Sequence, residues 1–317
     1  MLGLVLFGKL PDDGRWAVDV ANSAHGPAFA LVTLIVITLL RITRRQQAGP
    51  ALDYCVATAI ALVLGALIEL LQLATGGDTS FDDFLRDALG AVAAVGFFVL
   101  IDPRVRALPL HRPVQYAGLL AGIVCSAILI APLAIMTAAY RQRHHSFPTL
   151  VDFSSPLSTY FLDVHSAVTV DREELPSGMT GGAHGVIGLH TQIAGKNWWG
   201  VALREPYPDW RGYERLALDL ANPTDVPLLL RVQIRDRRQH RERRSGYRRS
   251  IEIAPHSRRT WTIPLAHLAS AQGTARVDTA IVSSIVLSRH PANQAKEFYV
   301  VRIWLDQAQS ETTATSG

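Results

Sequence analysis

Ionisable side chains interrupt two long apolar runs of this sequence, and their spacing is that of a binding or catalytic site. Glu69 and Gln72 lie near the end of one run, and Asp83 and Asp87 lie at the start of the next. The first two residues share one helical face at i, i+3, and the second two share one at i, i+4. His25 begins an earlier apolar run. An ionisable side chain is costly inside a bilayer, so it tends to face the bundle interior. The five residues therefore predict a polar intramembrane cavity that binds a substrate.

Four apolar runs must position these residues. They cover residues 24–40, 54–74, 84–101 and 116–139, and Gly or Pro breakers separate them at 49–50, 76–77 and 103–113. A crossing helix needs about 17 to 25 apolar residues, so the first run is near the lower limit. Small residues in the third run, and Gly118 and Gly122 in the fourth, favour close packing of the helices. The sequence predicts a four-span helical bundle over residues 1–147.

Basic residues in the short loops indicate the orientation of this bundle. The loops after the first and third runs each carry three arginines, namely Arg41, Arg44 and Arg45, and Arg104, Arg106 and Arg112. By the positive-inside rule these loops are cytoplasmic, and the second half of the chain is then extracytoplasmic. Arg141 and Arg143, just after the fourth run, argue against this assignment. The localisation predicted is the bacterial plasma membrane.

Simpler interpretations of the same residues stay open. Asp83 and Asp87 fit ordinary first-turn acids that the helix dipole favours, and His25 fits a capping or interfacial residue. Cys55 and Cys125 both fall within apolar runs, which predicts two buried small hydrophobes rather than a disulfide. Glu69 is harder to explain in this way, because five more residues of its apolar run follow it.

The polar pattern resembles the VanZ-like family of integral membrane proteins, which is named for a teicoplanin-resistance protein. That family has Glu-x-x-Gln at the end of one helix, followed by a spaced Asp, Asn and Gly. This chain has Glu69 and Gln72, then Asp83, Asp87 and Gly90. The resemblance covers about residues 20–101, and the fourth span is compatible with it. It implies an envelope protein linked to glycopeptide (teicoplanin) resistance.

One further position supports the resemblance, and two depart from it. His25 followed by Phe29 is similar to the family. Asp87 stands where the family usually has Asn. In the loop, the position at which the family usually has Arg corresponds to about Asp78. The departures make the cluster more acidic and weaken the idea of an arginine that clamps a phosphate or carboxylate.

The second half of the chain reads as short alternating strands between turn residues. The clearest are 215–222, 228–236, 259–265, 283–289 and 298–306. Such spacing predicts an antiparallel jelly-roll-type β-sandwich over residues 148–308, with a polar, disordered tail at 309–317. The pattern also resembles galactose-binding-like domains and carbohydrate-binding modules, which implies recognition of a wall glycan.

Two groups in this half could contact such a ligand. Trp198 and Trp199 lie between glycines and polar residues, where flat rings could stack on sugars, whereas Trp210 and Trp261 fit core positions better. Residues 235–249 hold eight arginines in fifteen positions, which suits anionic headgroups or a phosphate-rich polymer. The arginines predicted to contact an anionic surface are Arg237, Arg238, Arg241, Arg243 and Arg244. A solvated hairpin without specific contacts is the simpler alternative, and the outward topology argues against nucleic acid.

Three functional hypotheses follow. The first is an envelope factor without catalytic activity that binds a membrane lipid or lipid-linked precursor in the acidic cavity, while the sandwich recognises glycan. In the predicted orientation all five polar residues lie at similar depth near the outer membrane face, so this cavity faces outward. The second is an enzyme on such a substrate, with Glu69 as general base, Asp83 and Asp87 as acid or as ligands of a divalent cation, and His25 assisting. The third is a carbohydrate-binding module that the helices only anchor.

Overall fold

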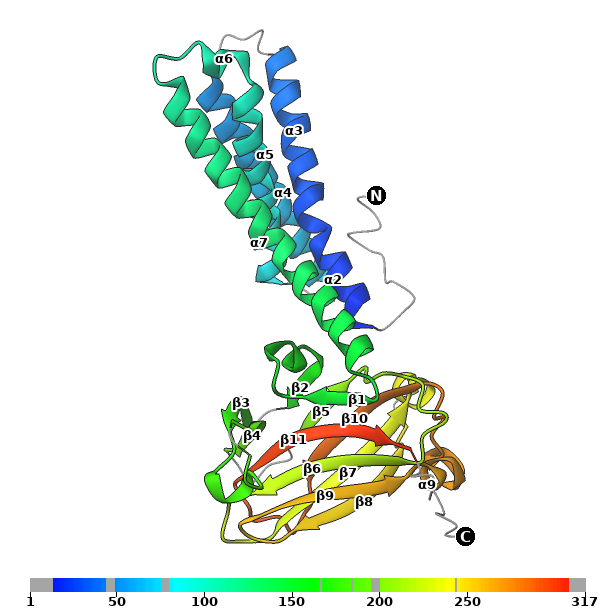
Figure 1. Cartoon of the computed structure of the whole chain (residues 1–317). Helices are drawn as coiled ribbons and strands as arrows, with labels where there is room; N and C mark the ends of the chain where they lie inside the picture. Colours follow the sequence, from blue (N-terminus) through cyan, green and yellow to red (C-terminus); the bar gives the residue numbers. More distant parts are fainter. Residues whose placement is uncertain are drawn as a thin grey trace, which may run out of the picture. The chain divides into compact units, whose positions relative to one another are not determined.

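The computed structural model describes residues 14–43, 49–75, 80–165, 167–183, 185–194, 200–242 and 244–307. The chain divides into two compact units, Met1–Thr137 and Ala138–Gly317. The first unit is helical, and the second is built mainly from β-strands (Figure 1). The tail predicted to be disordered, at 309–317, lies outside the described residues.

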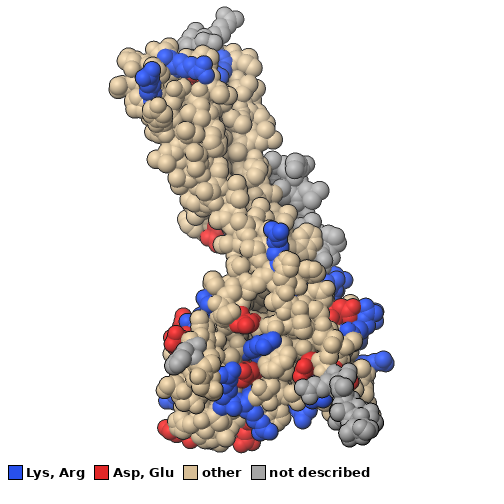
Figure 2. All heavy atoms as spheres, in the orientation of Figure 1, with Lys and Arg blue, Asp and Glu red and all other residues tan. Residues whose placement is uncertain are grey.

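The helical unit contains long apolar helices. They are α2 (Arg15–Ser23), α3 (His25–Thr43), α4 (Pro50–Thr75), α5 (Phe81–Ile101), the short α6 (Pro103–Arg106) and α7 (His111–Ser146), which continues into the second unit. Four segments are long and apolar enough to cross a membrane, namely Arg15–Thr43, Pro50–Thr75, Phe81–Ile101 and His111–Ser146. The sides of these helices are almost free of charged atoms on the face that Figure 2 shows. The structure therefore confirms four helices whose length and composition suit a membrane crossing.

The first membrane segment is longer than predicted. The sequence analysis placed it at 24–40, but helical structure runs from Arg15 to Thr43, with a turn at Ala24 between α2 and α3. The reason is that α2 is amphipathic, so its polar residues Arg15 and Asp19 break the apolar run without ending the helix.

Glycines bring the backbones of these helices into contact. A Cβ atom on Gly90 of α5 would lie 2.1 Å from the carbonyl oxygen of Gly26 on α3. A Cβ atom on Gly96 of α5 would lie 2.5 Å from the carbonyl oxygen of Gly118 on α7. Only a residue without a side chain allows such approach, which is the usual role of small residues at helix interfaces in membranes.

The second unit is a β-sandwich of two antiparallel sheets, which confirms the predicted fold class. One sheet has the order β3-β4-β11-β6-β9, with β1 also paired to β11, and the other has the order β2-β5-β10-β7-β8. The strands of the first sheet are β1 (Thr149–Asp152), β3 (Val168–Glu174), β4 (Ile187–Ile193), β6 (Arg215–Asn222), β9 (Ser257–Pro264) and β11 (Glu297–Asp306). Those of the second sheet are β2 (Leu162–His165), β5 (Gly200–Arg204), β7 (Leu228–Asp236), β8 (Tyr247–Ile253) and β10 (Val282–Arg289).

The core of the sandwich follows from alternation along its strands. On β6, Leu216, Leu218 and Leu220 are fully buried in the core, because alternate side chains of a strand point to one face. Short helices lie between some strands, notably α8 (Arg237–Arg241) between β7 and β8, and α9 (Leu265–Ser270) after β9. Trp210 is also fully buried in this core, as expected for tryptophan in a sandwich.

The cysteines differ in environment. Cys125 on α7 is buried, and Cys55 on α4 is exposed; both are free thiols. The expectation that both are buried is therefore wrong for Cys55. Cys55 precedes the buried Ala57 by two positions on α4, so it points away from the helix face that packs in the bundle.

Candidate functional site

The residues predicted to form the polar cavity lie on α3, α4 and α5, and together with Arg86 we call them the His25 cluster (His25, Glu69, Gln72, Asp83, Arg86 and Asp87). At its centre, Nδ1 of His25 on α3 lies 3.1 Å from Oδ1 of Asp87 on α5. His25 is 6% exposed and Asp87 is 2% exposed. Asp87 lies beyond the first turn of α5 and is paired across helices, so a simple dipole effect does not account for it. A buried pair of this kind is held by specific packing rather than by water.

Helix α4 adds the next part of the cluster. Gly65 faces Asp87, because a Cβ atom on Gly65 would lie 3.1 Å from Asp87 Oδ2. Glu69 and Gln72 follow Gly65 at i+4 and i+7, on the same face of α4. Glu69 Oε2 accepts a hydrogen bond of 2.9 Å from the backbone N–H of Ser80, the residue before α5. Glu69 therefore ties the end of α4 to the start of α5.

Two oxygen atoms of the cluster have no hydrogen-bond partner among the described residues. They are Glu69 Oε1 and the side-chain carbonyl oxygen of Gln72, and both atoms are buried. Because an unpaired buried acceptor is costly, a donor from outside the chain would stabilise this region. These oxygens are the groups of the cluster best suited to receive a hydroxyl or amine of a ligand.

Asp83 is held differently from Asp87. It pairs with Arg86, three residues further along α5, and both side chains are partly exposed. The charges of Asp83 and Arg86 act on His25 and Asp87. Sequence analysis missed Arg86, although its i, i+3 spacing from Asp83 is a signal for an ion pair on one helix face.

A second buried polar cluster, which we call the Asp102 cluster, was not predicted at all. Asp102 Oδ2 accepts a hydrogen bond of 2.5 Å from the Tyr54 hydroxyl, and Asp102 also pairs with Arg41 and with Arg104 at 3.3 Å. Arg104 in turn lies 2.7 Å from Oδ2 of Asp53. Burial disfavours the Asp102 carboxylate, but the hydrogen bonds from Tyr54 and Arg104 and the charge of Arg41 hold its pKa below its ordinary value.

The Asp102 cluster joins α3, α4 and the α5–α6 turn through its own residues. Both carboxylate oxygens of Asp102 have protein donors, and Asp102 is 0% exposed. This arrangement stabilises the bundle, because its carboxylates Asp53 and Asp102 are both paired with arginines, although Arg104 Nε is buried without a hydrogen-bond partner among the described residues. The His25 cluster, with its two unpaired acceptors, is the better candidate for binding.

An apolar groove lies beside the His25 cluster, between α3, α5 and α7. Its volume is about 630 Å³, and nearly all of its lining is apolar, including Ala30 and Leu34 of α3, Ala93 of α5 and Leu129 of α7. Gly26 and Gly90 also line it. These glycines adjoin the polar pair, since Gly26 follows His25 and Gly90 lies one turn after Asp87. From Gly90 to Ile101 the lining runs along twelve residues of α5, which rise about 16 Å along the helix axis.

The ligand-binding residues predicted in the sandwich are only partly described. Trp198, Trp199 and Arg243 lie outside the described residues, as does Asp78 of the membrane half. Arg237, Arg238, Arg241 and Arg244 are exposed on or just after α8. Trp261 packs against the core and stacks with the Arg259 guanidinium at 4.9 Å.

Sequence analysis also missed a histidine on the outer face of the first sheet. His190 on β4 lies 2.8 Å from Glu173 and 2.8 Å from Glu297 through its two ring nitrogens, and it stacks on Tyr299 with ring centroids 4.5 Å apart. Burial, with a contribution from the two glutamates, raises the pKa of Tyr299. Both nitrogens of His190 are occupied, so the group is closed.

The carboxylates of the His25 cluster do not form a metal site by themselves. Within the described stretches, no three His, Cys, Asp or Glu side chains gather closely enough to hold a metal ion. Glu69, Asp83 and Asp87 therefore do not form a three-carboxylate site in this conformation. A divalent cation bound with a substrate stays a prediction.

Comparisons with known proteins concern only the sandwich. No protein-family model matches the chain, and no curated protein sequence matches it. A family 11 carbohydrate-binding module from Clostridium thermocellum, solved with a β-1,3-1,4-mixed-linked tetrasaccharide, is 19% identical over 50% of this chain and 95% of that module, with a TM-score of 0.37. An exo-β-agarase is 15% identical over 51% of this chain and 25% of the agarase, with a TM-score of 0.40. At such identities and TM-scores, these likenesses carry no functional conclusion for this chain.

Proposed function

We propose that the helical unit binds a membrane amphiphile, either a lipid or a lipid-linked envelope precursor. The acyl chain would lie in the groove between α3, α5 and α7, and the polar head would lie at the His25 cluster. One observation carries the proposal. Gly26 and Gly90, which line the apolar groove, are close neighbours along α3 and α5 of the buried pair His25 and Asp87. An apolar groove on the same helices as a buried polar cluster matches the two parts of a lipid, its chain and its head.

The groove suits an acyl chain for two reasons. It lies on helices that are apolar enough to cross a membrane, so lipid chains are the molecules that surround it. Its extent of about 16 Å is roughly half of the 30 Å hydrocarbon core of a bilayer, which is the depth of one leaflet. A chain from one leaflet would therefore fill it.

The His25 cluster suits a head that carries hydrogen-bond donors. Glu69 Oε1 and the Gln72 carbonyl oxygen are unpaired acceptors, and carboxylates accept without donating. Hydroxyl groups of a sugar or glycerol, or an amine, would satisfy them. Arg86 adds a partly exposed cation for an anionic group, although Asp83 already neutralises much of its charge.

We also propose that the sandwich is extracytoplasmic, and one packing detail supports this. Arg143, whose charge argued against the orientation, donates a hydrogen bond of 2.6 Å to the Glu205 carbonyl and stacks on Tyr140 at 4.5 Å, both within the second unit. Because the Arg143 guanidinium takes part in the packing of the second unit, its charge is weak evidence for a cytoplasmic location. An alkaline phosphatase fused after Asp306 should be active, and an inactive fusion with normal expression would reverse the orientation.

The remaining parts of the proposed role rest on resemblance. A link to glycopeptide (teicoplanin) resistance follows only from the likeness of about residues 20–101 to VanZ-like proteins, and glycan recognition follows from the likeness of the sandwich pattern to carbohydrate-binding modules. Catalysis on the bound amphiphile is the main alternative, because Asp87 could orient His25 as a general base. Turnover that Asp87→Asn abolishes while lipid binding persists would favour the enzyme.

Lipid retention tests the binding proposal. The full chain, purified in mild detergent, should carry a bound phospholipid in native mass spectrometry. Ala30→Phe places a ring in the groove and is expected to reduce the lipid-bound fraction at least about five-fold, because the ring occupies the space of the acyl chain.

The matched control is Ala59→Phe, on an exposed position of α4 outside the groove. It should retain lipid as the unmodified chain does. Equal retention by both variants, with equal thermal stability, would contradict binding in the groove.

A further inference from the structure

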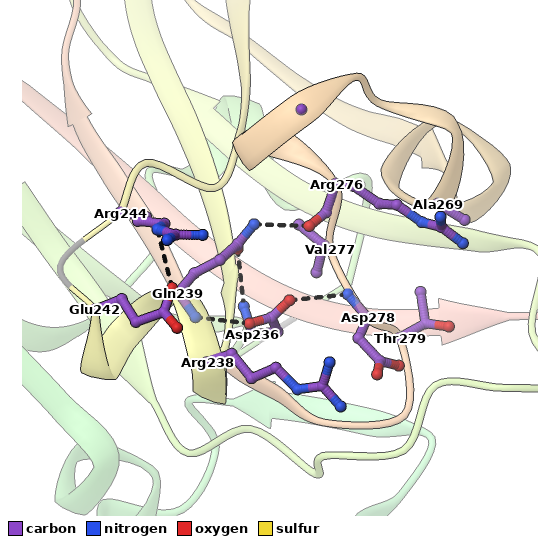
Figure 3. Close-up of a pocket in the computed structure, with 11 residues that line it drawn as sticks. Asp236, Arg238, Gln239, Glu242, Arg244, Ala269, Arg276, Val277, Asp278 and Thr279 are labelled. Atoms are coloured by element: carbon purple, nitrogen blue, oxygen red, sulfur yellow. Dashed lines mark hydrogen bonds and ion pairs between the residues drawn. The ribbon is translucent and has the colours of Figure 1, made fainter.

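The sandwich contains a pocket of about 710 Å³ next to α8. It is formed by α8 and the residues after it, by Ala269 at the end of α9, and by the segment 273–279 (Figure 3). All eleven residues that line it belong to the second unit, and none of them is aromatic. Its volume falls within the range of about 300–1,000 Å³ that is usual for small-molecule sites.

Hydrogen bonds hold the inner wall of this pocket in place. Asp236 Oδ1 accepts from the backbone N–H of Gln239 at 2.8 Å, and Asp236 Oδ2 accepts from the backbone N–H of Asp278 at 3.0 Å. Gln239 donates from its side chain to the Arg276 carbonyl at 2.7 Å. Asp236 and Gln239 are buried. These hydrogen bonds join α8 to the segment 273–279. They therefore hold the side chains that line the pocket on a rigid base.

Three arginines and three carboxylates line the pocket, but they differ in whether they are paired. Arg244 pairs with Glu242 at 2.9 Å. Arg238 and Arg276 are exposed, and neither guanidinium has a hydrogen bond or ion pair with another residue of the described chain. In Figure 3, Arg276 extends toward α9, and Arg238 lies on the other side of the pocket near Asp278. Arg238 and Arg276 are therefore the two cations of the pocket that an anionic ligand can reach without breaking an ion pair, whereas Asp236 is buried and accepts from backbone N–H groups.

We propose that this pocket binds an acidic sugar unit, that is, a saccharide or polyol that carries a carboxylate or a phosphate. Arg238 and Arg276 would bind the anionic group through their planar, bidentate donors. Asp278 and the Thr279 hydroxyl would bind ring or polyol hydroxyls. Since no aromatic ring lines the pocket, recognition depends on charge and hydrogen bonding rather than on stacking.

This site is independent of the lipid proposal, because all of its residues lie within 236–279 and the groove lies within 23–133. It also differs from a diffuse arginine patch. Of the eight arginines at 235–249, only Arg238 and Arg244 line the pocket, and Arg276 lies outside that run.

Calorimetry on the full chain in phosphatidylcholine nanodiscs tests the proposal with four probes. These are a galacturonic acid oligomer, a glycerol phosphate oligomer, a neutral glucose oligomer and inorganic phosphate. We expect the first or second probe to bind, and the neutral oligomer and inorganic phosphate to bind at least about ten-fold more weakly. Which of the two anionic oligomers binds better distinguishes a carboxylate from a phosphate ligand.

Two double variants separate the pocket from general charge. Arg238→Gln with Arg276→Gln should weaken binding of the anionic oligomer at least about ten-fold, the loss expected for charged hydrogen bonds. Arg215→Gln with Arg248→Gln removes the same charge from exposed positions outside the pocket, and should change affinity less than about two-fold. Equal losses in the two variants, equal binding of inorganic phosphate, equal binding of the neutral oligomer, or no binding of either anionic oligomer would each overturn the proposal.

Discussion

Replacing Asp102 by alanine is expected to destabilise the helical unit by about 3–5 kcal/mol, the usual cost of removing one partner from a buried ion pair. Asp102 is fully buried and is the common acceptor of Arg41, Tyr54 and Arg104. Without it, two guanidinium groups lose an anionic partner inside the bundle. Reversible unfolding of the full chain in mixed detergent micelles, followed by circular dichroism, measures the loss.

The control for this substitution is Asp82→Ala, at an exposed position in the first turn of α5, which should cost less than about 1 kcal/mol. The pH dependence gives a second check. Because the pKa of Asp102 is lowered in the folded chain, its stabilising contribution is complete above its unfolded pKa of about 4 and is lost as the pH falls through the lower folded value. A stability difference from Asp102→Asn that is unchanged between pH 7 and the acid range would contradict the assignment.

Replacing Gly90 by alanine is expected to cost about 3 kcal/mol or more, because the new methyl group cannot fit without separating two helices. Its Cβ would lie 2.1 Å from the backbone oxygen of Gly26. A backbone atom cannot move aside as a side chain can, so α3 and α5 must part. The 3.1 Å contact of His25 with Asp87 would be disturbed at the same time. We expect a lower unfolding midpoint and loss of bound lipid.

Gly49→Ala is the matched control, since a Cβ at Gly49 meets nothing within 4 Å. It should leave the unfolding midpoint unchanged or raise it slightly, because alanine has less backbone freedom in the unfolded chain. If the two variants are equally stable, the close approach of α3 and α5 is not the packing that holds this bundle together.

The sequence predicted the membrane segments and the strands well, because both follow from local hydrophobic patterns. Predicted strands at 215–222 and 228–236 coincide with β6 and β7. Helix α8 was missed because its many arginines suggested a solvated hairpin. The signal for it was present, since Asp236 and Gln239 have the spacing of a capping box and form one.

The polar clusters show where local patterns are insufficient. The sequence pattern placed His25 and Asp87 at similar depth. It could not show which acid pairs with the histidine, because that depends on how α3, α4 and α5 cross. Asp53 and Asp102 were not considered, since each flanks an apolar run next to loop residues and looks exposed. Their burial arises from partners about fifty residues away, which no local pattern contains.

Photoactivatable lipids test whether the groove holds an acyl chain with its head at the His25 cluster. A phospholipid with a diazirine at the end of its chain, and another with a diazirine on its head, would be cross-linked to the full chain in nanodiscs and mapped by mass spectrometry. We expect the chain-end probe to label the far end of the groove, at Leu34 and Ile101, and the head probe to label peptides with His25 and residues 80–87. Equal labelling by the chain-end probe of Leu52 and Leu67, which are exposed on α4, would contradict it.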